Sequence, residues 1–393
     1  MNLQLKSTTL LLILILSLNL FGQTKLEGEL IFPVQEKHVH SSSIVELPNG
    51  DLLVCWFKGS GERWSNDVFI QGARLQKGES KWSEPFLMAD TPGQPDCNPM
   101  MFLNQEGKLF LVWIMVQANL WENSILRVKT TTDYSGNGAP NWTWQDNIFL
   151  KPGDEFAKRV EEQFKKNGRN DLGWAGYAPQ YEEMLTEAAK DPSKRETGWM
   201  TRTHPIFLSD GKLLLPLYSD GFCFGLIAIS EDQGKTWKSS LPIVGRGLNQ
   251  PSLVQRKDGK LVAYMRDDGD EPGRILVSYS NDEGYSWTYA KRTEIPNPGA
   301  SIEVIKLKSG NWLMAYNDVD DGRYSFAVAL SDDEGASWKW KKHLEYKKGS
   351  SFSYPSVIQA KDGKIHITYS YHWAENQESI KHVVFDEEWV KEE

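Results

Sequence analysis

Cysteine is scarce in this chain, which has three among 393 residues. Cys55, Cys97 and Cys223 lie in or beside apolar segments and lack the close spacing of metal-binding cysteines. A set that is small, odd in number and scattered argues against a disulfide framework and predicts buried small side chains. We find no sequence motif that requires a metal ion or another cofactor.

Runs of one charge sign are also missing. The chain has a net charge of −9 and no cluster of Lys and Arg, which argues against nucleic acids and anionic membranes as partners. Aromatic residues, by contrast, are abundant, with 16 Trp. Because Trp and Tyr faces stack on sugar rings, this composition favours a carbohydrate partner.

After the N-terminus, no segment approaches the roughly 20 apolar residues of a membrane-spanning helix. The first 23 residues contain Lys6, an apolar stretch from Leu10 to Leu18, and small or polar residues around Gln23. This order is typical of a secretory signal peptide. We therefore predict a signal peptide over 1–23 and export to the periplasm or the medium.

Three copies of the pattern Ser-x-Asp-x-Gly-x-x-Trp begin at Ser230, Ser280 and Ser331. Their starts lie 50 and 51 residues apart, so each marks the same corner of a repeated unit. In such a turn the Asp accepts backbone N–H bonds, the Gly adopts a backbone conformation that other residues disfavour, and the Trp packs between strands. We expect these motifs to stabilise the fold and to take no part in catalysis.

A second repeat, a glycine turn followed by an apolar strand, runs in phase with the first. Its six glycines are Gly50, Gly107, Gly211, Gly259, Gly310 and Gly363. Asp-Gly and Asn-Gly before an apolar strand indicate hairpins, and repeats of about 40 to 50 residues with several short strands are typical of β-propellers. The sequence predicts an all-β, six-bladed β-propeller that forms one domain over 24–393.

The long interval between Gly107 and Gly211 contains two segments with helical spacing and few β-branched residues, DEFAKRVEEQFKK and YEEMLTEAAKD. They predict a helical insertion at about 152–198, between blades 2 and 3. With Trp174 and Tyr177, this insertion would either narrow the central funnel of the ring or serve as a spacer.

These motifs and the blade rhythm resemble the sialidase superfamily, and more closely its BNR-repeat, sialidase-like branch. In sialidases three arginines hold a carboxylate, a Tyr with a Glu partner is the nucleophile, and an Asp is the acid/base. The resemblance implies that Arg266 (YMRD) and Arg323 (GRYS) are the second and third arginines, Tyr354 (FSYPS) the tyrosine and Asp67 (SNDV) the aspartate.

Two positions depart from the sialidase pattern. His40 stands where the first arginine is expected, and Gln250 stands where the Glu partner of the tyrosine is expected. Because Gln cannot accept a proton, the usual activation of Tyr354 is missing. A structural alternative also exists for Arg266, since Asp267 and Asp268 follow it and could pair with it.

Other polar residues near strand starts are expected to line the central funnel and bind substrate. They are Glu62, Arg63, Arg202, His204, Gln250 and Glu303, with Asn98 and Asn249 at comparable positions.

The pair of arginines, the histidine and the tyrosine that remain favour chemistry on an acidic sugar. Arginines would neutralise a uronate carboxylate and acidify the C5 proton, and His40 and Tyr354 would act as base and acid in either order. We therefore predict an enzyme that acts on the ends of acidic oligosaccharides by β-elimination. The alternatives are an exo-α-sialidase or related exo-glycosidase, in which Tyr354 is activated through Asp67, Glu62 or Glu303, and a non-catalytic glycan-binding propeller.

Overall fold

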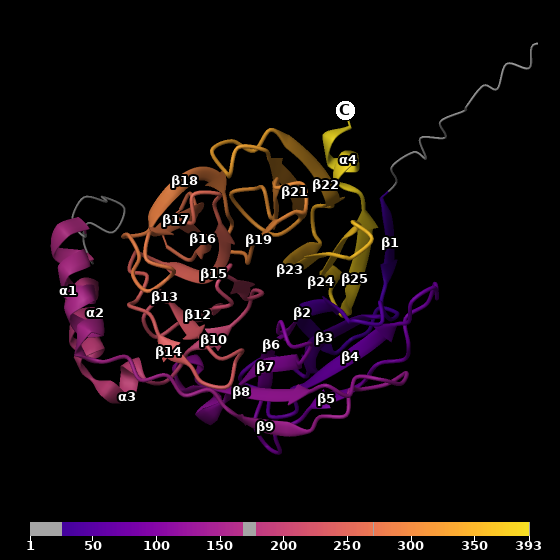
Figure 1. Cartoon of the computed structure of the whole chain (residues 1–393), viewed down its shortest axis with the longest axis horizontal. Helices are drawn as coiled ribbons and strands as arrows, with labels where there is room; N and C mark the ends of the chain where they lie inside the picture. Colours follow the sequence, from indigo (N-terminus) through magenta and orange to yellow (C-terminus); the bar gives the residue numbers. More distant parts are fainter. Residues whose placement is uncertain (1–25, 168–177, 270, 393) are drawn as a thin grey trace, which may run out of the picture.

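The computed structural model describes residues 26–167, 178–269 and 271–392. Six antiparallel sheets are arranged around a common centre (Figure 1), which confirms the prediction of a six-bladed β-propeller. In each blade one edge strand lies nearest the centre and the following strands lie progressively further out. Apolar side chains fill the blades and the spaces between them, where Trp56, Trp113 and Trp312 are fully buried.

The first three blades are built as follows. Blade 1 contains β2 (His38–Glu46), β3 (Leu52–Gly59), β4 (Phe69–Leu75) and β5 (Phe86–Ala89). Blade 2 contains β6 (Asp96–Leu103), β7 (Leu109–Val116), β8 (Ser124–Thr131) and β9 (Trp144–Asn147), with short 3-10 turns η1 (Gln117–Asn119) and η2 (Trp121–Asn123). Blade 3 contains β10 (Met200–Thr201), β11 (Ile206–Phe207), β12 (Leu213–Ser219), β13 (Phe224–Ser230) and β14 (Lys238–Ser239).

The last three blades complete the ring. Blade 4 contains β15 (Leu248–Gln255), β16 (Leu261–Asp267), β17 (Arg274–Ser280) and β18 (Lys291–Pro296). Blade 5 contains β19 (Glu303–Lys306), β20 (Trp312–Tyr316), β21 (Ser325–Ser331) and β22 (Trp340–Tyr346). Blade 6 contains β23 (Ser351–Gln359), β24 (Ile365–Ala374), β25 (Gln377–Phe385) and β1 (Glu27–Leu30), followed by α4 (Glu387–Lys391).

The N-terminal strand β1 closes the ring. It pairs antiparallel with β25 and supplies the outer strand of blade 6, with Glu27 opposite Val384 and Leu30 opposite Lys381. This pairing gives the last blade its fourth strand.

Serine side chains on the central strands tie neighbouring blades together. Ser43 Oγ accepts a hydrogen bond from the backbone N–H of Met101 on blade 2, and Ser356 Oγ accepts one from Ile44 on blade 1. Each bond crosses from one blade to the next at 2.9 Å. The angular positions of the blades, and of the side chains at their centre, are fixed in this way.

The three Ser-x-Asp motifs form the turns between the third and fourth strands of blades 3, 4 and 5. In the first of them, Asp232 Oδ1 accepts bonds from Ser230 Oγ and from the Thr236 N–H, both at 2.8 Å. Ser230 Oγ in turn accepts the Gly234 N–H at 2.8 Å. The motifs therefore act as turn clamps, as the sequence indicated.

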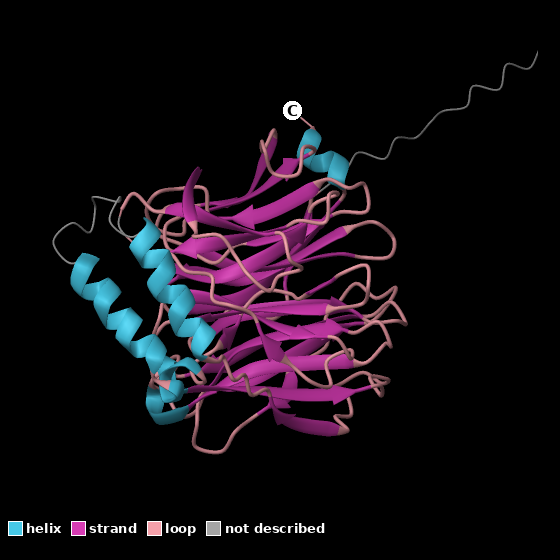
Figure 2. Cartoon of the chain, turned by 60° about the vertical axis from the view of Figure 1, so that its left-hand side comes forward, coloured by secondary structure: helices cyan, strands magenta, loops and turns pink. Residues whose placement is uncertain are grey.

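The predicted helical insertion is present and consists of α1 (Asp154–Asn167), α2 (Ala178–Lys190) and α3 (Pro192–Arg195). Its helices lie at the outer side of the ring and not over its centre (Figures 1 and 2). Phe156 packs against Phe222, and Glu182 of α2 forms a buried 2.7 Å ion pair with Arg246. The described helices do not narrow the funnel, while Trp174 and Tyr177 lie outside the described residues.

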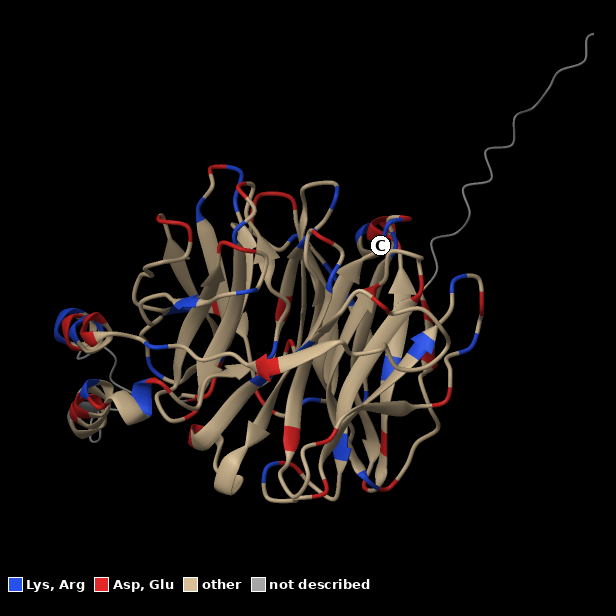
Figure 3. Ribbon diagram, turned by 60° about the horizontal axis from the view of Figure 1, so that its bottom comes forward, with Lys and Arg blue, Asp and Glu red and all other residues tan. Residues whose placement is uncertain are grey.

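Charged residues of both signs are interspersed along the ribbon (Figure 3). Cys55 and Cys97 are buried, Cys223 is half-buried, and all three are free thiols. Within the described ranges, no helix has the length and apolar character needed to cross a membrane. The predicted signal peptide lies outside the described residues.

Candidate functional site

Backbone bulges turn side chains toward the centre of the ring in four of the six blades. The central strands β2, β6, β15 and β23 each shift register at the same place. The residues with positive φ there are Ser41, Asn98, Gln250 and Tyr354. Because non-glycine residues disfavour this conformation, four aligned examples indicate a functional centre.

Tyr354 stands at the middle of this centre. Its hydroxyl oxygen accepts a 2.8 Å hydrogen bond from Arg266 Nη1 and a 3.2 Å bond from Gln250 Nε2. The structure thus brings together three residues that the sequence had placed at the site. Gln250 occupies the position beside the phenol where a proton acceptor would be needed for a tyrosine nucleophile.

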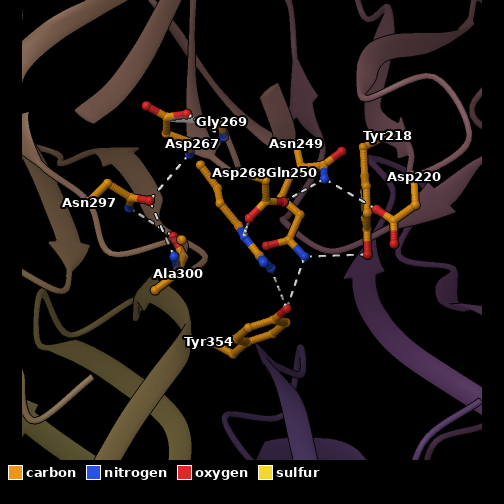
Figure 4. Close-up of polar contacts among 12 residues, drawn as sticks. Tyr218, Asp220, Asn249, Gln250, Asp267, Asp268, Gly269, Asn297, Ala300 and Tyr354 are labelled. Atoms are coloured by element: carbon orange, nitrogen blue, oxygen red, sulfur yellow. Dashed lines mark hydrogen bonds and ion pairs between the residues drawn. The ribbon is translucent and has the colours of Figure 1, made fainter. Parts of the chain in front are cut away.

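Tyr218 extends this network toward blade 2 and was missed from the sequence. Its hydroxyl is 3.3 Å from Gln250 Nε2 and accepts a 3.0 Å bond from Asn98 Nδ2. Figure 4 shows Tyr218, Gln250 and Tyr354 joined through their polar ends. The available signal was its position, since it ends the apolar run GKLLLPLY just before a polar turn.

Two carboxylates flank the network, and neither was predicted as a site residue. Asp268 Oδ1 accepts a 2.6 Å bond from Arg266 Nε, and Asn249 Nδ2 bridges Asp268 and Asp220 at 2.6 and 3.2 Å (Figure 4). Asp220 is exposed to solvent as a whole residue, although protein atoms surround its carboxyl group. Desolvation by the surrounding protein, assisted by the Asp268 carboxylate, raises the pKa of Asp220 to about 6 although Arg266 opposes this shift.

Two further guanidinium groups lie over the ring of Tyr354. The Cζ atoms of Arg202 and Arg323 are 5.0 and 5.5 Å from the ring centroid. Arg202 is buried and donates to the carbonyl oxygens of Ser42 and Pro355, at 3.3 and 2.6 Å. Backbone carbonyls of blades 1 and 6 therefore hold Arg202 in place, whereas Arg323 is partly exposed.

His40 also packs against the ring of Tyr354. Its ring centroid is 4.0 Å from that of Tyr354, it is 5% exposed, and its Nδ1 has no hydrogen-bond partner. Burial, with the positive charges of neighbouring groups, lowers the pKa of His40 well below its ordinary value. The imidazole is therefore uncharged at neutral pH.

His204 and Glu303 pair with each other inside the ring. Glu303 Oε1 is 2.8 Å from His204 Nδ1, Glu303 Oε2 accepts the Val357 N–H at 2.6 Å, and His204 Nε2 is 3.0 Å from Ile44 O. Burial alone would lower the pKa of His204, but the Glu303 carboxylate outweighs it and raises that pKa. These bonds join blades 1, 3, 5 and 6, and the predicted contact of both residues with substrate stays a prediction.

The Gly-rich loop of blade 1 holds the other three predicted residues. Asp67 accepts bonds from Ser60 and Lys37, which lower its pKa to about 2, so it is a carboxylate across the physiological range. Glu62 Oε1 is 3.5 Å from His38 Nε2. Arg63 stacks between Trp64 and Trp121, with Cζ 5.5 Å from each ring centroid. The structure thus places Asp67 in a surface ion pair with Lys37 and brings Glu62 next to His38.

The groups around Tyr354 define the chemistry that this centre can support. Guanidinium groups, a phenol and an uncharged imidazole converge from separate blades, which suits the binding of an anion and the movement of a proton beside it. In the described structure, none of the predicted site residues has a carboxylate oxygen within hydrogen-bond distance of the Tyr354 hydroxyl.

A six-bladed ring with these turn motifs, centred on a tyrosine among arginines, is a sialidase-like propeller. A family model described as a BNR repeat-like domain matches residues 50–169 and 190–367. The chain belongs to this BNR repeat-like family.

Known proteins agree with this assignment. A sialidase from Bacteroides fragilis is 25% identical over 216 residues, which are 51% of this chain and 37% of that protein, so this chain matches a little over a third of its length. The intramolecular trans-sialidase from Ruminococcus gnavus has a similar fold, with a TM-score of 0.68 and 13% identity over 92% of this chain and 98% of that one. A Dyadobacter fermentans protein of unknown function superposes with a TM-score of 0.67 and 14% identity, again over 92% and 98%.

Proposed function

We propose that this protein is a carbohydrate-active enzyme that cleaves or dehydrates terminal uronate residues of acidic oligosaccharides by β-elimination. The observation that carries the proposal is the contact of His40 with Tyr354, 4.0 Å between ring centroids. Arg266 donates to the hydroxyl of this tyrosine, and the Cζ of Arg323 is 5.5 Å from the centroid of its ring. A proton donor, a proton acceptor and an anion clamp are thus within reach of one sugar.

The proposed elimination needs no reactant other than the sugar and the two side chains. The carboxylate of the uronate pairs with Arg266 and Arg323, which withdraw electron density and acidify the proton at C5. One of His40 and Tyr354 removes this proton, a C4–C5 double bond forms, and the C4–O bond breaks. The other residue protonates the departing oxygen, which leaves as a sugar hydroxyl or as water.

Gln250 supports elimination over hydrolysis through a tyrosine nucleophile. Its amide Nε2 donates toward the Tyr354 hydroxyl, so it cannot take the proton that a nucleophilic phenol must lose. Elimination does not require Tyr354 to bond to the sugar, and a donor beside the phenol is compatible with it.

The test is an incubation of purified protein with a panel of uronate oligosaccharides and sialosides. Elimination produces a double bond conjugated with the carboxylate, which absorbs in the ultraviolet, and a product whose mass reveals the unsaturated sugar. Absence of any absorbing product from a varied uronate panel would overturn the proposal.

An exo-glycosidase, including a sialidase, is the second candidate function. Two observations favour it: the similarity to a Bacteroides fragilis sialidase, and Asp220, whose carboxyl group has a pKa of about 6 and is suited to protonate a leaving group. Hydrolysis of a fluorogenic sialoside without an absorbing product would identify this function. Glycan binding without turnover would identify a lectin-like propeller instead.

We also propose that the protein is exported, on the basis of the N-terminal apolar stretch from Leu10 to Leu18. Fractionation of producing cells tests this, with the protein expected in the periplasm or medium and shortened near Gln23. Full-length protein in the cytoplasm would refute it.

A further inference from the structure

We propose that His38, His372 and Glu378 form a binding site for a divalent transition-metal ion, specifically Zn²⁺, at the seam between blades 1 and 6. The three side chains each offer one ligand atom, and these atoms all lie within 4.8 Å of one another. The site is separate from the clamp formed by Arg266 and Arg323 and does not depend on the proposed reaction.

The distances between ligand atoms are close to those that a zinc ion requires. His38 Nδ1 is 2.9 Å and His372 Nε2 is 3.2 Å from Glu378 Oε2. Zinc binds nitrogen and oxygen at about 2.0 to 2.2 Å in a tetrahedral arrangement, which places neighbouring ligand atoms roughly 3.4 Å apart. Small side-chain adjustments therefore suffice to admit the ion, and His372 Nε2 would exchange its 3.0 Å bond to Val39 O for the metal.

Rigid strands hold the three ligands. His372 on β24 and Glu378 on β25 are paired directly across the hairpin, and His38 begins β2 of the neighbouring blade. The backbone N–H of Val39 donates a 3.0 Å bond to Glu378 Oε2, which fixes the carboxylate. A site assembled on paired strands keeps its geometry better than one on loops.

A fourth residue is placed to orient a metal ligand. Glu62 Oε1 lies 3.5 Å from His38 Nε2, the ring nitrogen opposite the one that faces Glu378. Metal-binding histidines commonly direct their second ring nitrogen toward a carboxylate, which fixes the ring and increases its basicity. His38 Nε2 is itself buried with no hydrogen-bond partner, so a modest approach of Glu62 completes the pattern.

The ligand set also indicates the kind of metal and its exposure. Two imidazoles and one carboxylate suit Zn²⁺ and not the oxygen-seeking Mg²⁺ or Ca²⁺. Three protein ligands leave the fourth zinc position open, as in catalytic sites. The rings of His38 and His372 are 5.5 and 5.7 Å from that of His40, so a bound ion would add positive charge next to the anion-binding centre.

The competing explanation is a network of hydrogen bonds without metal, in which a protonated His38 is held between Glu62 and Glu378. Isothermal titration of chelator-treated, full-length protein with ZnCl₂ separates the two. We expect one ion per chain, loss of that binding in His372→Ala and Glu378→Gln, and a weakening of about 10- to 100-fold in Glu62→Gln. Titration with MgCl₂ is expected to give no comparable binding.

His366→Gln is the matched control. His366 and His382 form another buried histidine pair in the same blade as His372, with His366 Nδ1 3.0 Å from His382 Nε2. The control is expected to bind one ion as the parent protein does. An anomalous-scattering map from a crystal soaked in ZnCl₂ locates the ion even if a variant fails to fold. Absence of stoichiometric binding, or a peak away from His38, His372 and Glu378, would overturn the proposal.

Discussion

The imidazole of His40 packs against the phenol ring of Tyr354 with an interplanar angle of 49°, although the two residues belong to the first and last blades. In the proposed reaction this contact would place two groups able to transfer protons beside a uronate held by Arg266 and Arg323.

Tyr354→Phe removes the oxygen that accepts bonds from Arg266 and Gln250 while keeping the ring against His40. We expect kcat for elimination to fall by about 10²- to 10⁴-fold, the usual contribution of a positioned acid or base. Initial rates from ultraviolet absorbance measure this. Tyr279→Phe, on an exposed part of β17, is the control, and an unchanged kcat in Tyr354→Phe would remove the tyrosine from the mechanism.

Arg323→Lys tests the anion clamp. A lysine keeps the charge but loses the forked donors that match a carboxylate, so we expect KM for a uronate substrate to rise about 10- to 100-fold, which corresponds to roughly 1.4 to 2.8 kcal/mol. The same change at Arg274, which pairs with Asp320 on the surface, should leave KM unchanged. Equal effects of the two variants would contradict the assignment of Arg323.

Gln250→Glu places a carboxylate where the amide now contacts the Tyr354 hydroxyl. If the protein is a lyase, the added negative charge repels the uronate carboxylate, and we expect at least a tenfold loss in kcat/KM, a loss of about 1.4 kcal/mol. If the protein is a glycosidase, the new proton acceptor should instead increase sialoside hydrolysis. Measuring both activities in one variant therefore discriminates between the two functions.

The affinity for an acidic sugar should fall as the pH rises through about 6. Asp220, whose pKa is raised to about 6, is protonated below that pH and anionic above it, and its charge lies beside the Arg266 region. Calorimetric titrations with a uronate oligosaccharide between about pH 5 and about pH 7 measure the effect. Asp220→Asn should flatten this dependence relative to the parent protein, whereas Asp320→Asn should not.

The stability of the fold should also depend on pH, through His366. Burial, with the nearby His382, lowers the pKa of His366 to about 4, so between about pH 6.5 and 4 the unfolded chain binds a proton that the folded chain does not. The free energy of unfolding should therefore decrease as the pH falls through this window, by on the order of 3 kcal/mol from this residue. Denaturant titrations should show a smaller decrease for His366→Gln, and the parental decrease for His343→Gln, an exposed control.

The repeated architecture could be predicted because its signals are local. Each Ser-x-Asp turn and each glycine hairpin is encoded within about ten residues, and the helical spacing of the insertion is equally local. The resemblance to sialidases placed Tyr354, Arg266 and Gln250 together, and the structure has them in contact.

The remaining features depend on how the ring closes. His38 and Glu378 are 340 residues apart in sequence, yet His38 Nδ1 lies 2.9 Å from Glu378 Oε2. No local pattern predicts such a contact. In the sequence, Tyr218 and Asp220 belong to an ordinary strand and the turn that follows it. They become part of the site only because blades 3 and 4 lie side by side in the ring. Glu303 begins a strand, as predicted, but the bond that its carboxylate accepts from the Val357 N–H of blade 6 could not be predicted from local sequence.

The pairing of β1 with β25 imposes an order on biosynthesis. β1 is translated before every strand of its own blade, and it has no backbone partner in that blade until β25, near the other end of the chain, has been made. His40 likewise meets Tyr354 only after blade 6 has joined blade 1. The ring therefore closes, and the cluster of His40, Tyr354 and Arg266 at its centre is completed, only once the strands of the last blade are available.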